Sequence, residues 1–272
     1  MRALVDLDRR WIFLAVFVLI AIVVIFPLGL PVRVTPMTKA MYDYVDKLPP
    51  GSVLWLGLDY GPSVAGELNP QLEAVVHHAF RKNLRIITYT MWNTQGTLGR
   101  NIIQKLMKEY NKEYGKDWVD LGFKPGGDTN LRLMTSSIKE AAAGVDYQGK
   151  SLDEFPLTRE VKALDKPYVA FIIDFPAGSP GAPQYLAIVT EVKGVPMGVG
   201  QIQMSVADSM QFVHSGQYKG MIPGLRGAAE YEQLVGKPAA AVRAMDGQTL
   251  AAGLVGLLII LGNVIYLTTR SR

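Results

Sequence analysis

Residues 168–174, YVAFIID, are apolar almost throughout and favour a strand that is covered on both faces. Such strands are typical of parallel sheets in α/β domains, because helices pack on both sides of the sheet. Working outward along the chain, similar stretches rich in β-branched and aromatic residues lie at residues 52–58, 84–91 and 118–123. We expect a further strand at residues 196–204.

Segments with helical spacing of their apolar side chains separate these strands. Asn69 and Pro70 have the residue types of an N-cap and a first helical turn, so a helix is expected to begin there. Further helices are expected over residues 37–48, 98–110, 131–143, 156–164, 184–192, 207–214 and 226–235. The alternation predicts an α/β fold with a mostly parallel, Rossmann-like, doubly wound sheet flanked by helices.

Two long apolar stretches flank this domain. Residues 11–30, WIFLAVFVLIAIVVIFPLGL, carry no charge, and residues 249–267 are similarly apolar. A helix needs about 20 such residues to cross a hydrocarbon core of about 30 Å. We therefore expect a transmembrane helix at each end of the chain. The first is expected to be an uncleaved signal-anchor, because no small-residue cleavage site follows it.

The expected division of the chain has five parts. These are a short tail (1–10), the first transmembrane helix (11–30), an α/β domain (31–248, core 51–236), the second transmembrane helix (249–267) and a short tail (268–272). Basic residues on the two sides of the apolar stretches nearly balance, and the terminal arginines lie closer to them. This favours a multi-pass protein of the cell membrane with cytoplasmic tails and an extracytoplasmic domain.

Composition excludes several kinds of site. The chain has no cysteine, which excludes disulfides, thiolate metal sites and a cysteine nucleophile. Part of the net charge of +4 comes from terminal arginines, so the middle domain is close to neutral and no nucleic-acid partner is expected. His77 and His78 are adjacent on a predicted helix and point to different faces, so no metal site is expected.

Small residues and one amide give the second apolar stretch a candidate packing face. The residues expected to pack there are Ala252, Gly253, Gly256, Gly262 and Asn263. Small residues let helix backbones approach closely, and a buried amide needs a hydrogen-bond partner. Two partners remain open: a second copy of the chain, or the first helix of the same chain.

Loops that follow the predicted strands carry the candidate ligand-binding residues, because ligands of open α/β sheets bind beyond the carboxyl ends of the strands. The candidates are Asp59, Tyr60 and Ser63 after the first strand, Asn93 and Thr94 after the second, Gly126, Gly127, Asp128 and Thr129 after the third, and Asp174 at the end of the fourth.

The loop at residues 124–130 combines two glycines with a helix start, a pattern that can bind an anion. It matches neither the Walker nor the dinucleotide fingerprint, and a tight strand-to-helix turn capped by Asp128 or Thr129 is the preferred explanation. Asp59 and Asp174 could hold a divalent cation or serve as acid and base, but aspartate is also a common first residue of a loop. The cofactor stays unassigned.

No complete catalytic motif is present, so we expect a membrane-anchored binding or assembly module within an oligomeric membrane complex rather than an enzyme. One alternative is a membrane-tethered hydrolase or phosphate-ligand enzyme that uses Asp59, Asp128 and Asp174. Another is an accessory subunit of a transporter or secretion assembly.

Overall fold

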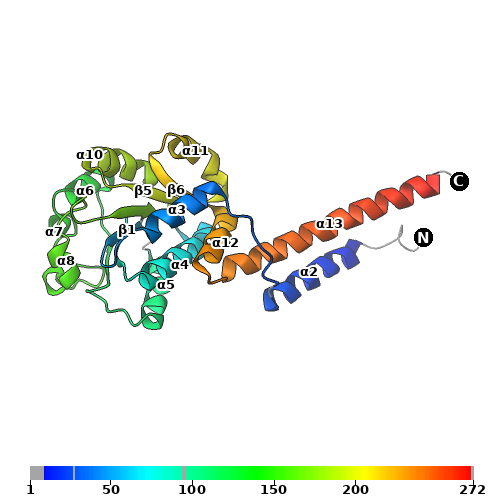
Figure 1. The fold of residues 1–272 in the computed structure, drawn as a ribbon, viewed down its shortest axis with the longest axis horizontal. Helices are drawn as coiled ribbons and strands as arrows, with labels where there is room; N and C mark the ends of the chain where they lie inside the picture. Colours follow the sequence, from blue (N-terminus) through cyan, green and yellow to red (C-terminus); the bar gives the residue numbers. More distant parts are fainter. Residues whose placement is uncertain (1–8, 27, 94–95, 271–272) are drawn as a thin grey trace.

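A computed structural model of the chain describes residues 9–26, 28–93 and 96–270 (Figure 1). An α/β domain lies at one end of the molecule, and a pair of helices projects from it. The first described residues lie part-way along α13 (Ala240–Arg270) and the last lie at its far end, both away from the sheet.

Six parallel strands form a single sheet with the order β3-β2-β1-β4-β5-β6. They are β1 (Val53–Gly57), β2 (Arg85–Thr90), β3 (Trp118–Phe123), β4 (Phe171–Asp174), β5 (Met197–Gln201) and β6 (Tyr218–Pro223). In this register Trp55 of the central strand β1 lies opposite Ile87 on one side and Ile172 on the other. The expected α/β class with a parallel sheet is confirmed.

The strand β6 was not predicted from the sequence. Its six residues include an exposed lysine and end in proline, a composition that argues against a central strand. Both features are tolerated here because β6 lies at the edge of the sheet, where charged side chains and proline also oppose further strand pairing.

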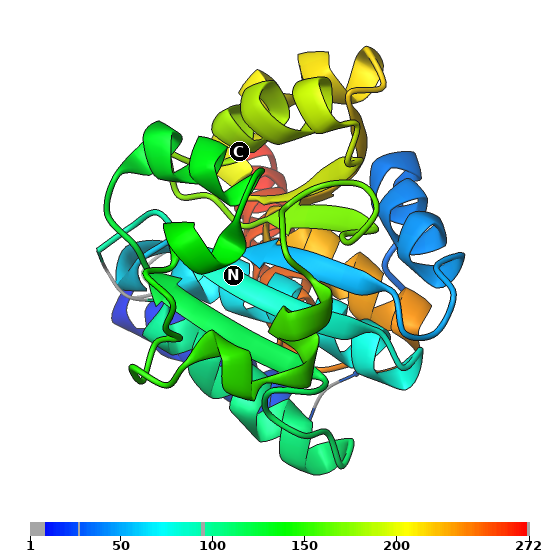
Figure 2. The same cartoon turned by 90° about the vertical axis from the view of Figure 1, so that its left-hand side faces the viewer.

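Helices cover both faces of the sheet. Figure 2, in which the projecting helices point away from the viewer, shows strands side by side with helices on either side. One face packs against α3 (Pro36–Asp46), α4 (Ala65–Arg81), α5 (Thr97–Glu109) and α12 (Gly224–Val235). The other packs against α6 (Gly127–Met134), α7 (Ile138–Ala141), α8 (Pro156–Glu160), α9 (Ala182–Tyr185) with its continuation through η3 (Leu186–Thr190) and α10 (Glu191–Lys193), and α11 (Val206–His214).

Two helix predictions need correction. The helix α4 begins at Ala65, after the short turn η1 (Pro62–Val64), so Asn69 is not an N-cap and its side chain instead accepts a hydrogen bond from Tyr60 Oη at 2.8 Å. The helix expected over residues 131–143 is divided into α6 and α7. Ser137 caps α7 by accepting a hydrogen bond from the Glu140 backbone N–H, which starts a new helix.

The projecting pair consists of α2 (Arg9–Ile25) and α13 (Ala240–Arg270), which pack against each other. Large apolar side chains on both are exposed, for example Phe17 at 70% and Ile260 at 64%. Among the described residues, only α13 is long and apolar enough to cross a membrane. The structure therefore supports one candidate spanning helix, and not the two expected from the sequence.

The first apolar stretch is shorter as a helix than its composition predicted. The helix α2 ends at Ile25, two residues before Pro27 in the sequence, and proline is a helix breaker. The backbone N–H groups of Gly29 and Leu30 instead donate to the Asp246 carboxylate at 2.8 and 3.0 Å. With 17 residues, α2 is about 25 Å long, which is less than the hydrocarbon core.

Side chains of α12 hold the helical pair to the domain. Glu232 accepts hydrogen bonds from the backbone N–H groups of Ala239, Ala241 and Val242 at 2.8 to 3.0 Å, and so caps the start of α13. Gln233 bonds the backbone of Leu30 and Val32, and Glu230 accepts from Thr35. Hydrogen bonds from this one helix therefore fix both the segment that follows α2 and the start of α13.

Candidate functional site

The strand order reverses between β1 and β4, and this switch point is where doubly wound sheets bind their ligands. The helix α4 after β1 lies on one face of the sheet, whereas α9 after β4 lies on the other. Asp59 follows β1 by two residues, and Asp174 is the last residue of β4. Two of the predicted site residues are thus brought to the same place by the topology.

Asp59 is fully buried and only half satisfied. Its Oδ1 accepts hydrogen bonds from the Met91 backbone N–H at 2.6 Å and from Thr90 Oγ1 at 3.2 Å. Its Oδ2 has no hydrogen-bond partner in the described part of the chain. Buried polar atoms are nearly always paired, so an unpaired carboxyl oxygen at a switch point marks a candidate site.

Asp174 is also fully buried, and neither of its carboxyl oxygens has a partner among the described residues. The lack of a side chain at Gly57 makes room for it: a Cβ at Gly57 would lie 2.1 Å from Asp174 Oδ1. The Tyr185 ring closes the other side of this space, at 3.1 Å from the same position. Gly57 and the Tyr185 ring therefore define the space that the Asp174 carboxyl occupies.

The two carboxyl groups influence each other. Burial raises the pKa of Asp59 to about 7. Burial, and then the charge of Asp59, raise the pKa of Asp174 well above its ordinary value. They lie close enough for a proton on one to be donated to the other. The pair can therefore share one proton at neutral pH, as adjacent carboxyls do in general when both cannot ionise.

Aromatic side chains surround the pair. Tyr185 is fully buried and accepts a hydrogen bond from Trp55 Nε1 at 3.2 Å; burial and both carboxyls raise its pKa. Burial also raises the pKa of Tyr89 to about 12, and its hydroxyl accepts a hydrogen bond from Asn130 at 3.4 Å. These rings keep water away from the carboxyls, which explains the raised pKa values.

A pocket of about 420 Å³ opens beside the pair, lined by Met91, Trp92, Asn93, Ser179 and Pro180. Trp92 Nε1 donates to the Pro180 carbonyl at 2.7 Å, which links the loop after β2 to the loop after β4. Within this cover, a Cβ at Gly181 would lie 3.4 Å from Asp174 Oδ2. The carboxyl pair thus lies just beneath a cover made of two loops, next to an open pocket.

The other predicted site residues do not join the pair. Tyr60 is buried against Asn69, and Ser63 is exposed in η1. Asp128 and Thr129 are exposed in the first turn of α6, after Gly126 and Gly127 with φ of 114° and 48°. Asn93 lines the pocket, and Thr94 lies outside the described residues.

Sequence reasoning did not select Tyr185, Gly57 or Tyr89 for this site. No motif signals them, because their roles depend on the approach of β4 and α9 to β1. For metal binding, no group of three or more His, Cys, Asp or Glu side chains is arranged around a common point in residues 9–26, 28–93 and 96–270.

Fold and site together define a doubly wound α/β domain with a buried pair of carboxyl groups at its switch point. Comparison of the chain with protein-family models, with curated proteins and with solved structures found no match.

Proposed function

We propose that this chain is a membrane-anchored binding module whose α/β domain takes a small ligand at the switch point. The observation that carries the proposal is the buried Asp59–Asp174 pair: a shared proton lets two of its three otherwise unpaired oxygens satisfy each other, and one carboxyl oxygen is left without a donor in the described chain. An unpaired buried acceptor is unfavourable unless a ligand supplies the missing donor. The pair is complementary to an amine or another cationic donor, because one shared proton leaves it with one negative charge.

A ligand would enter through the pocket beside Trp92 and Pro180. Because both aspartates are closed to solvent, the Trp92–Pro180 contact has to open for entry and can close again over the ligand. Ligand binding at such a site would be slow and selective, because the ligand reaches the carboxyls only when this contact is open.

The test uses full-length protein in detergent micelles and follows its melting temperature. Putrescine serves as the amine probe, Mg²⁺ as a cation without N–H donors, and glycerol as a neutral control. We expect putrescine to stabilise the native chain and to have no effect on Asp174→Asn. Asp128→Asn is the matched control, since it removes an exposed carboxyl after β3. The proposal fails if no amine shifts the melting temperature, or if the shift survives in Asp174→Asn.

The second candidate is a membrane-tethered hydrolase or phosphate-ligand enzyme. It is favoured by the pKa of Asp59 near 7, which suits a general acid or base at neutral pH. Asp128 is exposed and contributes nothing to the pair, so this enzyme would depend on Asp59 and Asp174 alone. A bell-shaped pH–rate profile on any ester or phosphate substrate, abolished in Asp59→Asn, would favour it over simple binding.

Membrane attachment belongs to the same proposal. The exposed apolar side chains of α2 and α13 would lie in lipid, with the end of α13 on the side of the membrane opposite the domain. We place the C-terminal tail in the cytoplasm and the domain outside the cell membrane. An accessory role in a transporter or secretion assembly fits the same arrangement, and a partner that co-purifies in stoichiometric amount would favour it.

Oligomer formation through α13 is proposed as well. Gly247 is the α13 glycine that approaches α2: a Cβ there would lie 3.9 Å from Ile20. Gly256 and Asn263 lie about 160–180° around the helix from Gly247, at 100° per residue, and so face away from α2. The Asn263 amide donates to the Ile259 carbonyl of its own helix at 3.0 Å. Of the two partners left open by the sequence, this favours a second copy.

The size of the detergent-solubilised particle tests this assembly. Gly256→Leu combined with Asn263→Leu is expected to reduce the particle to a monomer, because bulky side chains prevent close helix approach. Val255→Leu, about 100° around the helix from Gly256 and outside the candidate packing set, is expected to leave the size unchanged. An unchanged size in the double variant removes the assembly part of the proposal.

A further inference from the structure

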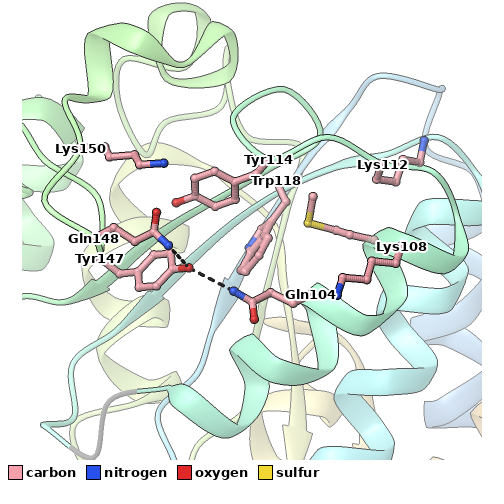
Figure 3. A pocket seen from close by; sticks show the side chains of 9 residues that line it. Gln104, Lys108, Lys112, Tyr114, Trp118, Tyr147, Gln148 and Lys150 are labelled. Carbon is pink, nitrogen blue, oxygen red and sulfur yellow. Dashed lines mark hydrogen bonds between the residues drawn. The ribbon is translucent and has the colours of Figure 1, made fainter.

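A second pocket lies beside β3, at the opposite edge of the sheet from β6. It has a volume of about 480 Å³ and lies between α5 and the loop at residues 146–150 (Figure 3). This size falls within the range of small-molecule sites, about 300–1,000 Å³. It is separate from the carboxyl pair, and nothing in the proposed function uses it.

A fixed aromatic ring forms one wall of this pocket. Tyr114 meets the rings of Trp118, Tyr147 and Phe155 edge-on, with centroids 5.3, 6.1 and 5.3 Å away. Its hydroxyl donates to Asp146 Oδ2 at 2.7 Å and accepts from the Asp120 backbone N–H. Because its hydroxyl is engaged, Tyr114 offers a ligand only the face and edge of its ring.

Tyr147 supplies a directed donor. Its hydroxyl accepts hydrogen bonds from Gln104 Nε2 at 3.1 Å and from Gln148 Nε2 at 2.8 Å, as the dashed lines in Figure 3 show. A phenol oxygen that accepts two hydrogen bonds keeps its own hydrogen free to donate. The Arg100 guanidinium lies over the Tyr147 ring at 4.0 Å and helps to fix its position.

Three lysines surround the opening: Lys108 and Lys112 on the α5 side and Lys150 on the loop side (Figure 3). Lys112 is anchored by Asn83 Oδ1 at 2.8 Å, with Asp117 at 3.8 Å. Lys108 and Lys150 form no ion pair with any described residue. No carboxylate is among the described residues that line the pocket. The Asp146 carboxylate, which bonds Tyr114, also accepts hydrogen bonds from two backbone N–H groups.

We propose that this pocket binds a small molecule in which an anionic group is joined to a planar ring, as in a nucleoside monophosphate. The lysines and the Tyr147 hydroxyl receive the anionic group, and the Tyr114 and Tyr147 rings receive the planar part. A pocket that held donors alone would select any anion, and one that held rings alone would select any flat molecule. The combination selects a ligand that has both features.

Isothermal titration of full-length protein in detergent tests this assignment with defined probes. Adenosine 5′-monophosphate is compared with adenosine, which lacks the charge, and with inorganic phosphate, which lacks the ring; 1-naphthyl phosphate is a second ring-bearing anion. We expect both ring-bearing phosphates to bind at least tenfold more tightly than adenosine or phosphate, and their binding to weaken as salt is raised.

Variants locate the binding. Lys108→Gln with Lys150→Gln is expected to weaken binding at least tenfold, and Tyr147→Phe severalfold, because it keeps the ring and removes the donor. Lys105→Gln is the control, since Lys105 lies on the same helix but pairs with Glu73 outside the pocket. The inference is overturned if neither ring-bearing phosphate binds, if phosphate alone binds as tightly, or if Lys105→Gln is as damaging as the double variant. None of these results bears on the Asp59–Asp174 pair.

Discussion

Among single residues, the buried aspartates of this domain differ in the charge of their neighbour: one lies beside a cation and another beside a second carboxyl. Asp120 has a cation beside it, because Arg100 Nε donates to its Oδ2 at 2.6 Å. Asp174 has no ion pair with any described residue, and the like-charged Asp59 acts on it instead. A buried charge with a partner depends on that partner, whereas a buried charge beside its like is unfavourable when both are ionised.

The pH dependence of stability should follow from this difference. The pKa of Asp59 is about 7 in the folded protein and about 3.9 in an unfolded chain. Between these values the folded protein keeps a proton that the unfolded chain has lost. The free energy of unfolding is therefore highest below about pH 4 and falls as pH rises toward 7, by up to about 1.4 kcal/mol per unit for each of the two carboxyls, since the pKa of Asp174 is raised as well. Melting temperatures measured across this range should therefore decrease steadily.

Asp174→Asn should reverse the loss at high pH. The amide cannot ionise, so at pH 8 the variant should be more stable than the native chain by about 1–3 kcal/mol, and its pH dependence should be flatter. Asp120→Asn provides the contrast, since loss of the charge opposite Arg100 should destabilise by about 3 kcal/mol. If Asp174→Asn destabilises at pH 8 as Asp120→Asn does, the pair is not a repelling one.

Gly57 should be intolerant of any side chain. In Gly57→Ala the new methyl group would meet Asp174 Oδ1 at 2.1 Å and the Tyr185 ring at 3.1 Å, so we expect a loss of about 3 kcal/mol. Combining it with Asp174→Ala makes room, and the double variant should lose less than the two single losses combined. Thermal unfolding followed by tryptophan fluorescence measures both. Strict additivity would show that Gly57 does not serve to admit the carboxyl.

At the scale of elements, what the sequence can predict depends on whether the deciding interactions are local. Apolar, β-branched stretches identified β1 to β5, because a strand buried on both faces needs such side chains wherever it lies in the sheet. The edge strand β6 was missed because an edge tolerates lysine and proline. The apolar stretch at residues 11–30 was predicted to be helical throughout, whereas polar contacts from Asp246 hold its last residues in a non-helical form.

The candidate site was half predictable for the same reason. Aspartates at the ends of strands can be found in the sequence, but which of them meet depends on strand order. Asp59 and Asp174 follow the neighbouring strands β1 and β4, while Asp128 follows β3, which is two strands from β1. Strands are about 4.8 Å apart, so Asp128 starts about 10 Å from the pair. Tyr185 was missed because α9 reaches the site only through the folded crossover.

The helix α12 should control how firmly α13 is fixed to the domain. Glu232→Ala removes the acceptor of three backbone N–H groups, so the start of α13 should loosen by about 1–2 kcal/mol. Hydrogen exchange over residues 239–246 should accelerate, with exchange in the sheet unchanged. Glu109→Ala is the control, because it breaks only an exposed ion pair with Lys237 at the same junction. Equal acceleration in both variants would assign the effect to surface charge rather than to capping.

At the scale of the whole molecule, the relative position of α2 and α13 decides how the chain can sit in a bilayer. Since Ile20 lies beside Gly247 and the helices run in opposite directions, Arg10 is level with about residue 257. The apolar stretch of α13 continues for about ten more residues, or about 15 Å. In this arrangement α13 would cross the hydrocarbon core completely, while α2 would accompany it for only part of the way.

Cross-linking can measure this position, because the chain has no cysteine of its own. Ile20→Cys with Gly247→Cys should form a disulfide on mild oxidation in membranes, since a Cβ at Gly247 would lie 3.9 Å from Ile20 Cγ2. Ile20→Cys with Leu254→Cys should not, because Leu254 lies on the same side of α13 but about 10 Å further along. The opposite result would mean that α2 is displaced along α13 to cover residues 249–267. Two complete spans, as the sequence alone predicts, would then replace the single one.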